Sequence, residues 1–218
     1  MSIITLATTK GGAGKTTVAE VIIGVVHGMG YSVGVIDSDP NCSLSSWIQY
    51  TSKMAIETCQ VQEEAKIVET AKRLKRKHDL VIIDTPGARS QATVFAVGCA
   101  NLVLIPVQLS SSDVKEALKT YNLVKGAGDM SNRQIDTQLL FTGYTPNTNI
   151  AKEVRQQVAK HSLPTLNTRM HHLVAYKEMS YTGALPKTGR AAAQGQLLVQ
   201  EIAERGHLPF LQEFKQAS

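Results

Sequence analysis

The sequence predicts an α/β fold, a doubly wound and mostly parallel sheet with helices on both faces. First, short apolar runs alternate with segments of helical periodicity along almost the whole chain. Second, most of these runs are apolar on both faces, as in parallel strands that are covered on both sides. Third, a glycine-rich loop separates the first apolar run from the first helical pattern. The 218 residues contain no evident linker, repeat or low-complexity tract, so we expect a single domain over residues 1–218.

The alternation defines five strands and six helices, in an order that implies right-handed crossovers. We expect strands over Ile3–Ala7, Val33–Ile36, Leu80–Ile83, Leu102–Val107 and Leu139–Thr142. We expect helices over Thr16–His27, Val61–Lys77, Asp113–Lys125, Ile150–His161, Arg169–Tyr181 and Arg190–Arg205. Two further segments are expected to be loops, Gly126–Asp129 and Tyr144–Asn149. The pair His171–His172 would then lie on a helix surface.

The composition indicates a cellular compartment but leaves the kind of partner open. A formal net charge of +5 and a pI near 9.1 permit an anionic partner without requiring one. No apolar run reaches the roughly 18 residues needed to cross a bilayer, and the first residues lack the features of a signal peptide. Cys42, Cys59 and Cys99 are too widely spaced for a zinc site or a disulfide framework, which fits a reducing cytoplasm. We expect Cys99 to be a buried core thiol.

The stretch TTKGGAGKTT, from Thr8 to Thr17, has the features of a phosphate-binding loop. It follows a strand and opens a helix, so backbone N–H groups and the helix N-terminus can surround phosphate oxygens. Lys15 would reach the β- and γ-phosphates, and the Thr16 hydroxyl would bind Mg²⁺. Thr9 stands where the general pattern has a glycine, whereas the narrower pattern KGGxGKT[ST] is complete. The expected nucleotide-binding residues are Lys10, Gly11, Gly12, Ala13, Gly14, Lys15, Thr16 and Thr17; the alternative is a glycine turn with no ligand.

Three carboxylates are expected at the same edge of the sheet as this loop. Asp37 and Asp39, in VIDSDP, follow the second strand and share a face in an extended segment. Asp84, in LVIIDTPG, ends the third predicted strand and would hold Mg²⁺ through a water. The Gly87 N–H could sense the γ-phosphate. The alternative for each aspartate is a turn or helix-cap role. No [NT]KxD guanine-recognition motif follows a later strand, so we expect ATP rather than GTP.

These motifs together resemble the ParA/MinD family of deviant Walker ATPases, closest to its short plasmid-partition ParA members. The resemblance implies that Lys10 reaches across a nucleotide-sandwich dimer to the phosphates held by the other subunit. It implies that Asp39 positions or activates the attacking water and that Asp37 supports the Mg²⁺ shell. Asn41 departs from the family, which usually has glutamine there. The segment SLSSWIQY, Ser43–Tyr50, also resembles the short members, in which a helix follows the DxDP loop; packing by Trp47 and Ile48 is compatible with this.

The family implies an ATPase with weak basal activity that uses ATP and Mg²⁺ as a switch. An ATP-bound homodimer would bind nonspecific DNA, and a small DNA-binding adaptor, ParB-like, would trigger hydrolysis and release. The implied function is plasmid or chromosome segregation by a cytoplasmic, nucleoid-associated protein. Alternatives are the positioning of a protein cargo or a conjugation complex, a metabolic P-loop enzyme such as a synthetase, and a scaffold whose nucleotide is only structural.

Two basic sets are candidates for contact with DNA phosphates. One lies where short family members carry DNA-contacting residues, namely Arg169, Lys177, Lys187 and Arg190. The other ends a predicted helix, where a solvated face is the favoured reading, namely Lys72, Arg73, Lys75, Arg76 and Lys77. Membrane anchoring is not expected, because the tail EIAERGHLPFLQEFKQAS is interrupted by Gly206 and Pro209 and carries Glu201, Glu204 and Glu213.

Overall fold

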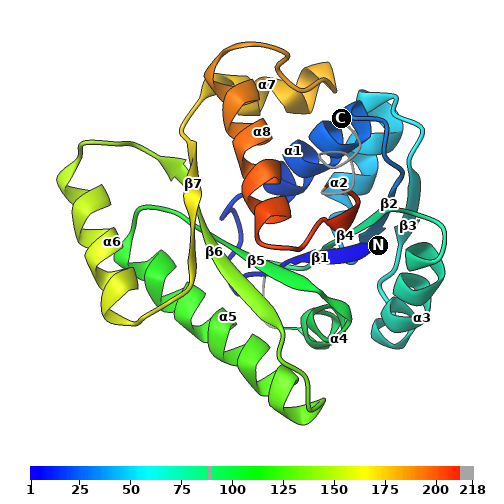
Figure 1. Ribbon diagram of the computed structural model, residues 1–218, viewed down its shortest axis with the longest axis horizontal. Coiled ribbons are helices and arrows are strands. Elements are labelled where there is room, and N and C mark those ends of the chain that lie inside the picture. The colour runs from blue at the N-terminus through cyan, green and yellow to red at the C-terminus, as the bar shows by residue number, and fades with distance from the viewer. Residues whose placement is uncertain (88–89, 212–218) are drawn as a thin grey trace.

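The computed structural model describes residues 1–87 and 90–211 and confirms the predicted fold class (Figure 1). A seven-stranded sheet has the order β3-β2-β4-β1-β5-β6-β7, and every pair of neighbours is parallel. Its strands are β1 (Ser2–Leu6), β2 (Val33–Asp37), β3 (Glu57–Gln60), β4 (Leu80–Asp84), β5 (Leu102–Val107), β6 (Asp136–Tyr144) and β7 (Thr165–His171).

Helices pack on both faces of the sheet (Figure 1). One face is covered by α1 (Lys15–Gly28), α2 (Ser43–Ser46), the π-helix η1 (Trp47–Ser52), α7 (Val174–Thr182) and α8 (Gly189–Glu204). The other face is covered by α3 (Glu64–Lys75), α4 (Gln91–Cys99), α5 (Ser111–Met130) and α6 (Asn149–Lys160). Among the described residues, no helix combines the length and apolar character needed to cross a membrane.

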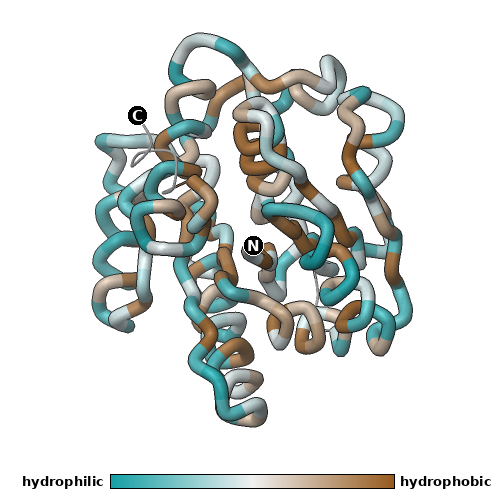
Figure 2. The backbone as a smooth tube through the Cα atoms, turned by 45° about the vertical axis from the view of Figure 1, so that its right-hand side comes forward, coloured by the Kyte–Doolittle hydropathy of each residue, from teal (hydrophilic) through white to brown (hydrophobic). Residues whose placement is uncertain are grey.

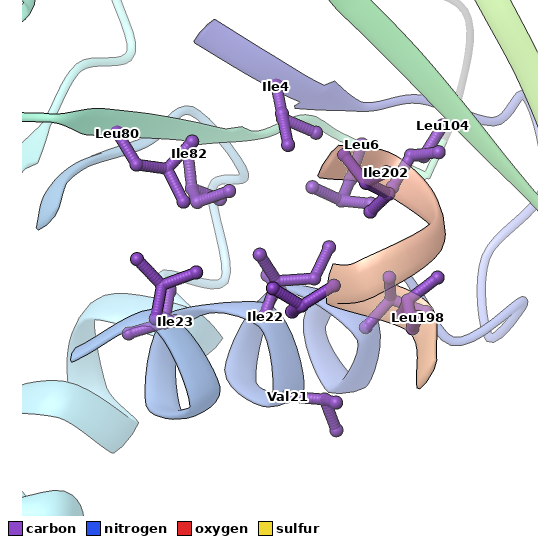
Figure 3. Close-up of a cluster of buried hydrophobic side chains, with 14 of the residues drawn as sticks. Ile4, Leu6, Val21, Ile22, Ile23, Leu80, Ile82, Leu104, Leu198 and Ile202 are labelled. Carbon is purple, nitrogen blue, oxygen red and sulfur yellow. The ribbon is translucent and has the colours of Figure 1, made fainter. Parts of the chain in front are cut away.

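The core under α1 accounts for one of the two apolar faces of the central strands, and the core under α3 and α4 accounts for the other. Ile22 and Ile23 of α1 face Ile82 of β4, while Leu198 and Ile202 of α8 close the same layer (Figure 3). All five side chains are fully buried. Hydrophobic segments run through the interior, and many outer turns are hydrophilic (Figure 2). This burial fixes the strand ends, and therefore the loops that follow them, at one edge of the sheet.

Several predicted boundaries are wrong. Arg169–Tyr181 is not one helix, because its first residues belong to β7 and the helix begins at Val174. His171 is consequently in a strand and His172 in the connection after it, not on a helix surface. Gly126–Asp129 is not a loop but the last part of α5. Two further elements, β3 and α4, were not predicted.

Other expectations about these segments hold in part. A helix does follow the DxDP loop, and its Trp47 is buried with the indole N–H donating to the Met179 carbonyl at 2.8 Å. Cys99 is half-buried at the margin of the core rather than fully enclosed. Of the tail considered for membrane anchoring, residues 212–218 lie outside the described residues.

Candidate nucleotide-binding site

The glycine loop between β1 and α1 is held in shape by one side chain that follows β5 and one from β6. Gly12 and Gly14 have φ values of 75° and 95°, in the left-handed region that favours glycine. The Gln108 side chain donates to the Gly12 carbonyl at 2.9 Å, and the Thr142 hydroxyl donates to the Ala13 carbonyl at 2.8 Å. These two hydrogen bonds fix the orientation of both loop carbonyls. The first-turn N–H groups of α1 have no intrahelical partners and are therefore available to an anion.

Thr9, which replaces the usual first glycine, anchors the loop to α5. Its hydroxyl donates to the Glu116 carboxylate at 2.6 Å, and its backbone N–H donates to the Thr120 hydroxyl at 3.2 Å. A glycine could make only the backbone contact. The departure from the general motif therefore has a structural role and does not disturb the phosphate-facing half of the loop.

Lys10 also contacts α5, through an ion pair. Its ammonium lies 2.9 Å from Asp113 Oδ1 and 3.5 Å from the Ser112 hydroxyl. The Lys10 side chain is 38% exposed, whereas that of Asp113 is 4% exposed. Asp113 also accepts a hydrogen bond from Ser110, within the N-terminal cap of α5. In the single chain, the Lys10 side chain thus contacts its own subunit.

Lys15, Thr16 and Asp84 form the centre of the site. The Thr16 hydroxyl donates to Asp84 Oδ2 at 2.8 Å, while Asp84 Oδ1 is buried and has no hydrogen-bond partner among the described residues. Burial raises the pKa of Asp84 to about 7, although Lys15 and Thr16 act in the opposite direction. A buried carboxylate oxygen without a partner, beside a threonine hydroxyl, fits the oxygen ligands that Mg²⁺ prefers.

Asp37 ends β2 and Asp39 lines the cavity, and the two differ in their surroundings. Asp37 is fully buried, which raises its pKa, and it accepts backbone N–H groups from Ser45 at 2.8 Å and Asp39 at 3.2 Å. It therefore fixes the loop between β2 and α2. Asp39 is half-buried, and its Oδ1 accepts both the backbone N–H and the side-chain amide of Asn41 at 2.9 Å.

Gly87 brings the loop after β4 against the glycine loop. A Cβ atom added at Gly87 would lie 2.8 Å from the Gly11 Cα and 3.4 Å from the Lys15 ammonium. A side chain at this position would therefore collide with backbone. Together the loops enclose a cavity of about 610 Å³, lined by the glycine loop, by Asp39 and Asn41, and by Gly87. This volume is typical of a small-molecule site.

Glu20 is a residue near the site that the sequence interpretation missed. It is 7% exposed and lies on α1 one helical turn beyond Thr16. Burial, and then the charge of Asp84, raises its pKa to about 8. The signal was available in the sequence, because Glu20 interrupts the otherwise apolar run VAEVII at a core-facing position.

The candidate DNA-contacting residues are not all equally available. Lys177, Lys187 and Arg190 are exposed, whereas Arg169 is half-buried with its guanidinium 5.0 Å from the Tyr144 ring centroid. In the basic run over residues 72–77, at the end of α3, Arg73 and Lys77 pair with Glu57 of β3. The neighbouring His78 also contacts Glu57. That run is therefore partly neutralised, while Lys72 and Arg76 are exposed.

Comparisons with known sequences identify the family. A family model described as VirC1 protein matches residues 1–207. The chain is 28% identical over 194 residues to protein virC1 of Rhizobium radiobacter, covering 86% of this chain and 84% of that protein. It is 31% identical over 147 residues to protein ParA of the same organism, covering 67% and 66%. It is 26% identical over 198 residues to maintenance of carboxysome distribution protein A of Halothiobacillus neapolitanus, covering 87% and 90%.

Solved structures agree on the fold. MinD of Pyrococcus horikoshii OT3, complexed with Mg-ADP, has a TM-score of 0.74 at 17% identity and covers 92% of this chain and 95% of its own. A putative plasmid partition protein of Borrelia burgdorferi B31, bound to AMPPNP, has a TM-score of 0.73 at 15% identity and covers 94% and 99%. With the family model spanning nearly the whole sequence, this chain belongs to the VirC1 family, which is homologous to the ParA and MinD-like ATPases.

Proposed function

We propose that this chain is an ATPase that uses bound Mg²⁺·ATP to control its dimerisation and its attachment to nonspecific DNA, in the segregation of DNA. The observation that carries the proposal is the arrangement of Lys15, Thr16 and Asp84 at the mouth of the glycine loop. The Thr16–Asp84 hydrogen bond of 2.8 Å and the unpartnered Asp84 Oδ1 supply oxygen ligands beside a buried lysine.

The glycine loop, residues 10–17, would hold the triphosphate through its backbone N–H groups and through Lys15. Thr16 and Asp84 would bind Mg²⁺, which supplies charge neutralisation at the β- and γ-phosphates. Asp37 would act one shell further out, because both of its oxygens accept backbone N–H groups. Asp39 would orient the attacking water from the rim of the cavity, where Asn41 holds its Oδ1 and, among the described residues, Oδ2 has no hydrogen bond to Asn41.

Lys10 would couple nucleotide binding to the formation of a homodimer. Its charge is compensated in the single chain by Asp113 at 2.9 Å. Leaving that partner is favourable when a triphosphate on a second subunit offers a stronger negative charge. Weak basal turnover follows, because a subunit on its own lacks a lysine from a neighbour.

Nonspecific DNA would bind to exposed cations in the C-terminal third, with Lys177, Lys187 and Arg190 as the leading candidates. Hydrolysis and release would be stimulated by a small DNA-binding adaptor, ParB-like. A role in segregation is supported by the relatives, since one is named ParA and a structural neighbour is a putative plasmid partition protein. The second candidate function is the positioning of a protein cargo, which the similarity to a carboxysome distribution protein favours.

Replacement of Lys15 tests the nucleotide site. Lys15→Ala removes a charge-assisted contact to phosphate worth about 1.5–3 kcal/mol, so we expect roughly 10- to 100-fold weaker binding of a fluorescent ATP analogue. Phosphate release should fall to background. Lys152→Ala, at an exposed position of α6, is the matched control and should behave as the parent. Normal turnover by Lys15→Ala would overturn the assignment of the site.

Replacement of Asp39 separates hydrolysis from assembly. Asp39→Ala should slow phosphate release by roughly 10²–10⁴-fold, because the carboxylate that orients water is lost. The variant should still bind ATP and form a dimer, measured by light scattering with Mg²⁺·ATP. That dimer should bind DNA of arbitrary sequence, with an affinity that falls steeply as salt rises. A dimer without affinity for DNA would favour a protein cargo over DNA segregation.

A further inference from the structure

An apolar groove lies on the opposite side of α4 from the sheet. It is bounded by three helices: Val68 comes from α3, Phe95 and Cys99 from α4, and Ala127 and Met130 from α5. Its volume of about 210 Å³ is far larger than the roughly 30 Å³ that one water occupies. Figure 1 shows α4 between α3 and α5. The groove lies on the outer side of α4, because its lining residues Val94 and Phe95 are partly exposed whereas Ala92 and Ala96 face the core.

The sequence of α4 is unusual for a helix at a surface. Its nine residues, QATVFAVGC, contain no charged side chain. Ala92, Ala96 and Val97 are buried in the core, while Val94 and Phe95 on the other side are 39% and 40% exposed. A surface helix normally places polar residues on its outer side, and a helix that is apolar all round is normally covered.

Met130 extends the exposed apolar surface at the end of α5. Its side chain is 88% exposed, although it lines the same groove as Phe95. Contiguous apolar surface of this kind, formed by large side chains from separate helices, marks an interaction site in folded proteins more often than isolated exposed residues do.

The charges beside the groove define the kind of partner. Burial raises the pKa of the Cys99 thiol in the groove, and the two cations Arg133 and Lys72 oppose this rise. Arg133 is fixed there because its guanidinium donates to the Gly98 carbonyl at 2.9 Å and to the Ala100 carbonyl at 3.1 Å. Lys72 is exposed one turn beyond Val68 on α3, with Glu69 between them. Glu69 and Asp129, which precedes Met130 in the chain, are also exposed, but of these groups only the two cations act on the Cys99 thiol, so the charge nearest the groove is positive.

We propose that this groove binds a segment of a partner protein that inserts a large apolar side chain between α3, α4 and α5 and places carboxylates against Lys72 and Arg133. The groove lies on the outer side of α4, apart from the nucleotide cavity, so this interaction is separate from the function proposed above. Binding hot spots are large side chains that fill well-packed pockets, and complementary charges around them add specificity.

A displayed library of random peptides, each of roughly 16 residues or about four helical turns, tests the proposal without nucleotide. Selection on the wild-type chain should enrich peptides with an apolar anchor flanked by Asp or Glu. Phe95→Ser and Met130→Lys should each weaken binding of the selected peptides by about tenfold or more. Leu197→Ser, at a 54% exposed apolar position on α8, is the matched control and should leave binding unchanged.

Charge reversal and folding controls complete the test. Lys72→Glu should weaken the acidic peptides by roughly three- to tenfold, and added salt should reduce the difference from wild type. Met130→Lys alters a side chain that is almost fully exposed, so its melting temperature should match that of wild type. No enrichment, basic flanks in the enriched peptides, or binding unaffected by Phe95→Ser and Met130→Lys would each overturn the proposal. Self-association without nucleotide that Met130→Lys abolishes would also overturn it, by assigning the groove to a second copy of the chain.

Discussion

Glu20 places a carboxyl group in the apolar interior beneath the phosphate-binding loop. Its position on α1 is one turn beyond Thr16, and Asp84 acts on it electrostatically. Because burial disfavours the charged form, the pKa is raised from 4.5 to about 8. The protonated form therefore contributes stability that is fully present below about pH 4.5. This stability is lost as the pH rises through about 8.

Glu20→Gln should remove most of this loss of stability at higher pH. Without nucleotide or Mg²⁺, we expect the parent to lose stability on the order of a few kcal/mol between pH 5 and pH 8, and the variant to lose clearly less. Some dependence should persist, because the pKa of Asp84 is raised to about 7. Thermal unfolding across this pH range measures the effect, with Glu153→Gln at an exposed position of α6 as control. Parallel curves for parent and Glu20→Gln would contradict the prediction.

At the level of elements, the strand β7 is an open sheet edge that α8 covers with side chains. The Glu201 carboxylate accepts the backbone N–H groups of Asn167 and Thr168, each at 2.8 Å, and Gln194 accepts that of His171 at 3.0 Å. Burial alone would raise the pKa of Glu201, but these N–H donors lower it overall. Backbone N–H groups of an edge strand can otherwise pair with another chain. Here three of them are hydrogen-bonded to side chains of α8 instead.

Glu201→Ala should destabilise the protein by about 1.5–3 kcal/mol, because two backbone N–H groups lose a charged acceptor. Glu201→Gln, which keeps one carbonyl acceptor, should fall between this variant and the parent. The midpoint of urea unfolding measures both, and Glu204→Ala on the exposed side of α8 is the control. Since the pKa of Glu201 is lowered, its contribution should be present at neutral pH and decline as the solution becomes acid. Equal midpoints for Glu201→Ala and the control would contradict this role for α8.

The strands that the sequence predicted are those whose pattern is set by burial on both faces. The five predicted strands are central and apolar, whereas β7 and β3 are edge strands with mostly polar or half-buried residues. The last three residues of β7 were mistaken for the start of a helix, because the strand depends on contacts with α8 that no local pattern shows. The glycines near the end of α5 suggested a break, but a Cβ at Gly128 would lie 2.6 Å from the Arg133 carbonyl. Glycine there permits close packing.

At the scale of the whole molecule, the parts of the site that are continuous in sequence could be predicted. The contacts that join distant segments could not, because they depend on the fold. The glycine loop is a continuous stretch of sequence, and its expected neighbours Asp39 and Asp84 follow strands that end at the same sheet edge. The pairing of Lys10 with Asp113 joins residues 103 positions apart, and the anchoring of Thr9 to Glu116 spans 107. Both depend on how α5 packs against β5, the strand beside β1, which the spacing of motifs does not encode.

The Lys10–Asp113 pair leads to a prediction about assembly. If Lys10 must leave Asp113 to reach a partner subunit's phosphates, the ion pair opposes dimerisation. Because Lys10 is partly exposed, the pair is worth about 0.5–1 kcal/mol, so Asp113→Asn should strengthen ATP-dependent dimerisation roughly two- to fivefold. Asparagine keeps the shape of the α5 cap. Lys10→Ala should have the opposite effect and abolish the ATP-dependent dimer while leaving nucleotide binding to the single chain largely intact.

Sedimentation at several protein concentrations, with Mg²⁺ and a non-hydrolysable ATP analogue, distinguishes these outcomes. Lys119→Ala, which removes an exposed lysine of α5 that pairs with Glu116, controls for a general change of charge on this helix. The ion pair is screened by salt, so the advantage of Asp113→Asn over the parent should shrink as ionic strength rises. If Asp113→Asn instead dimerised less readily than the parent, Asp113 would contribute to the interface, and Lys10 would be held in the orientation that the dimer uses.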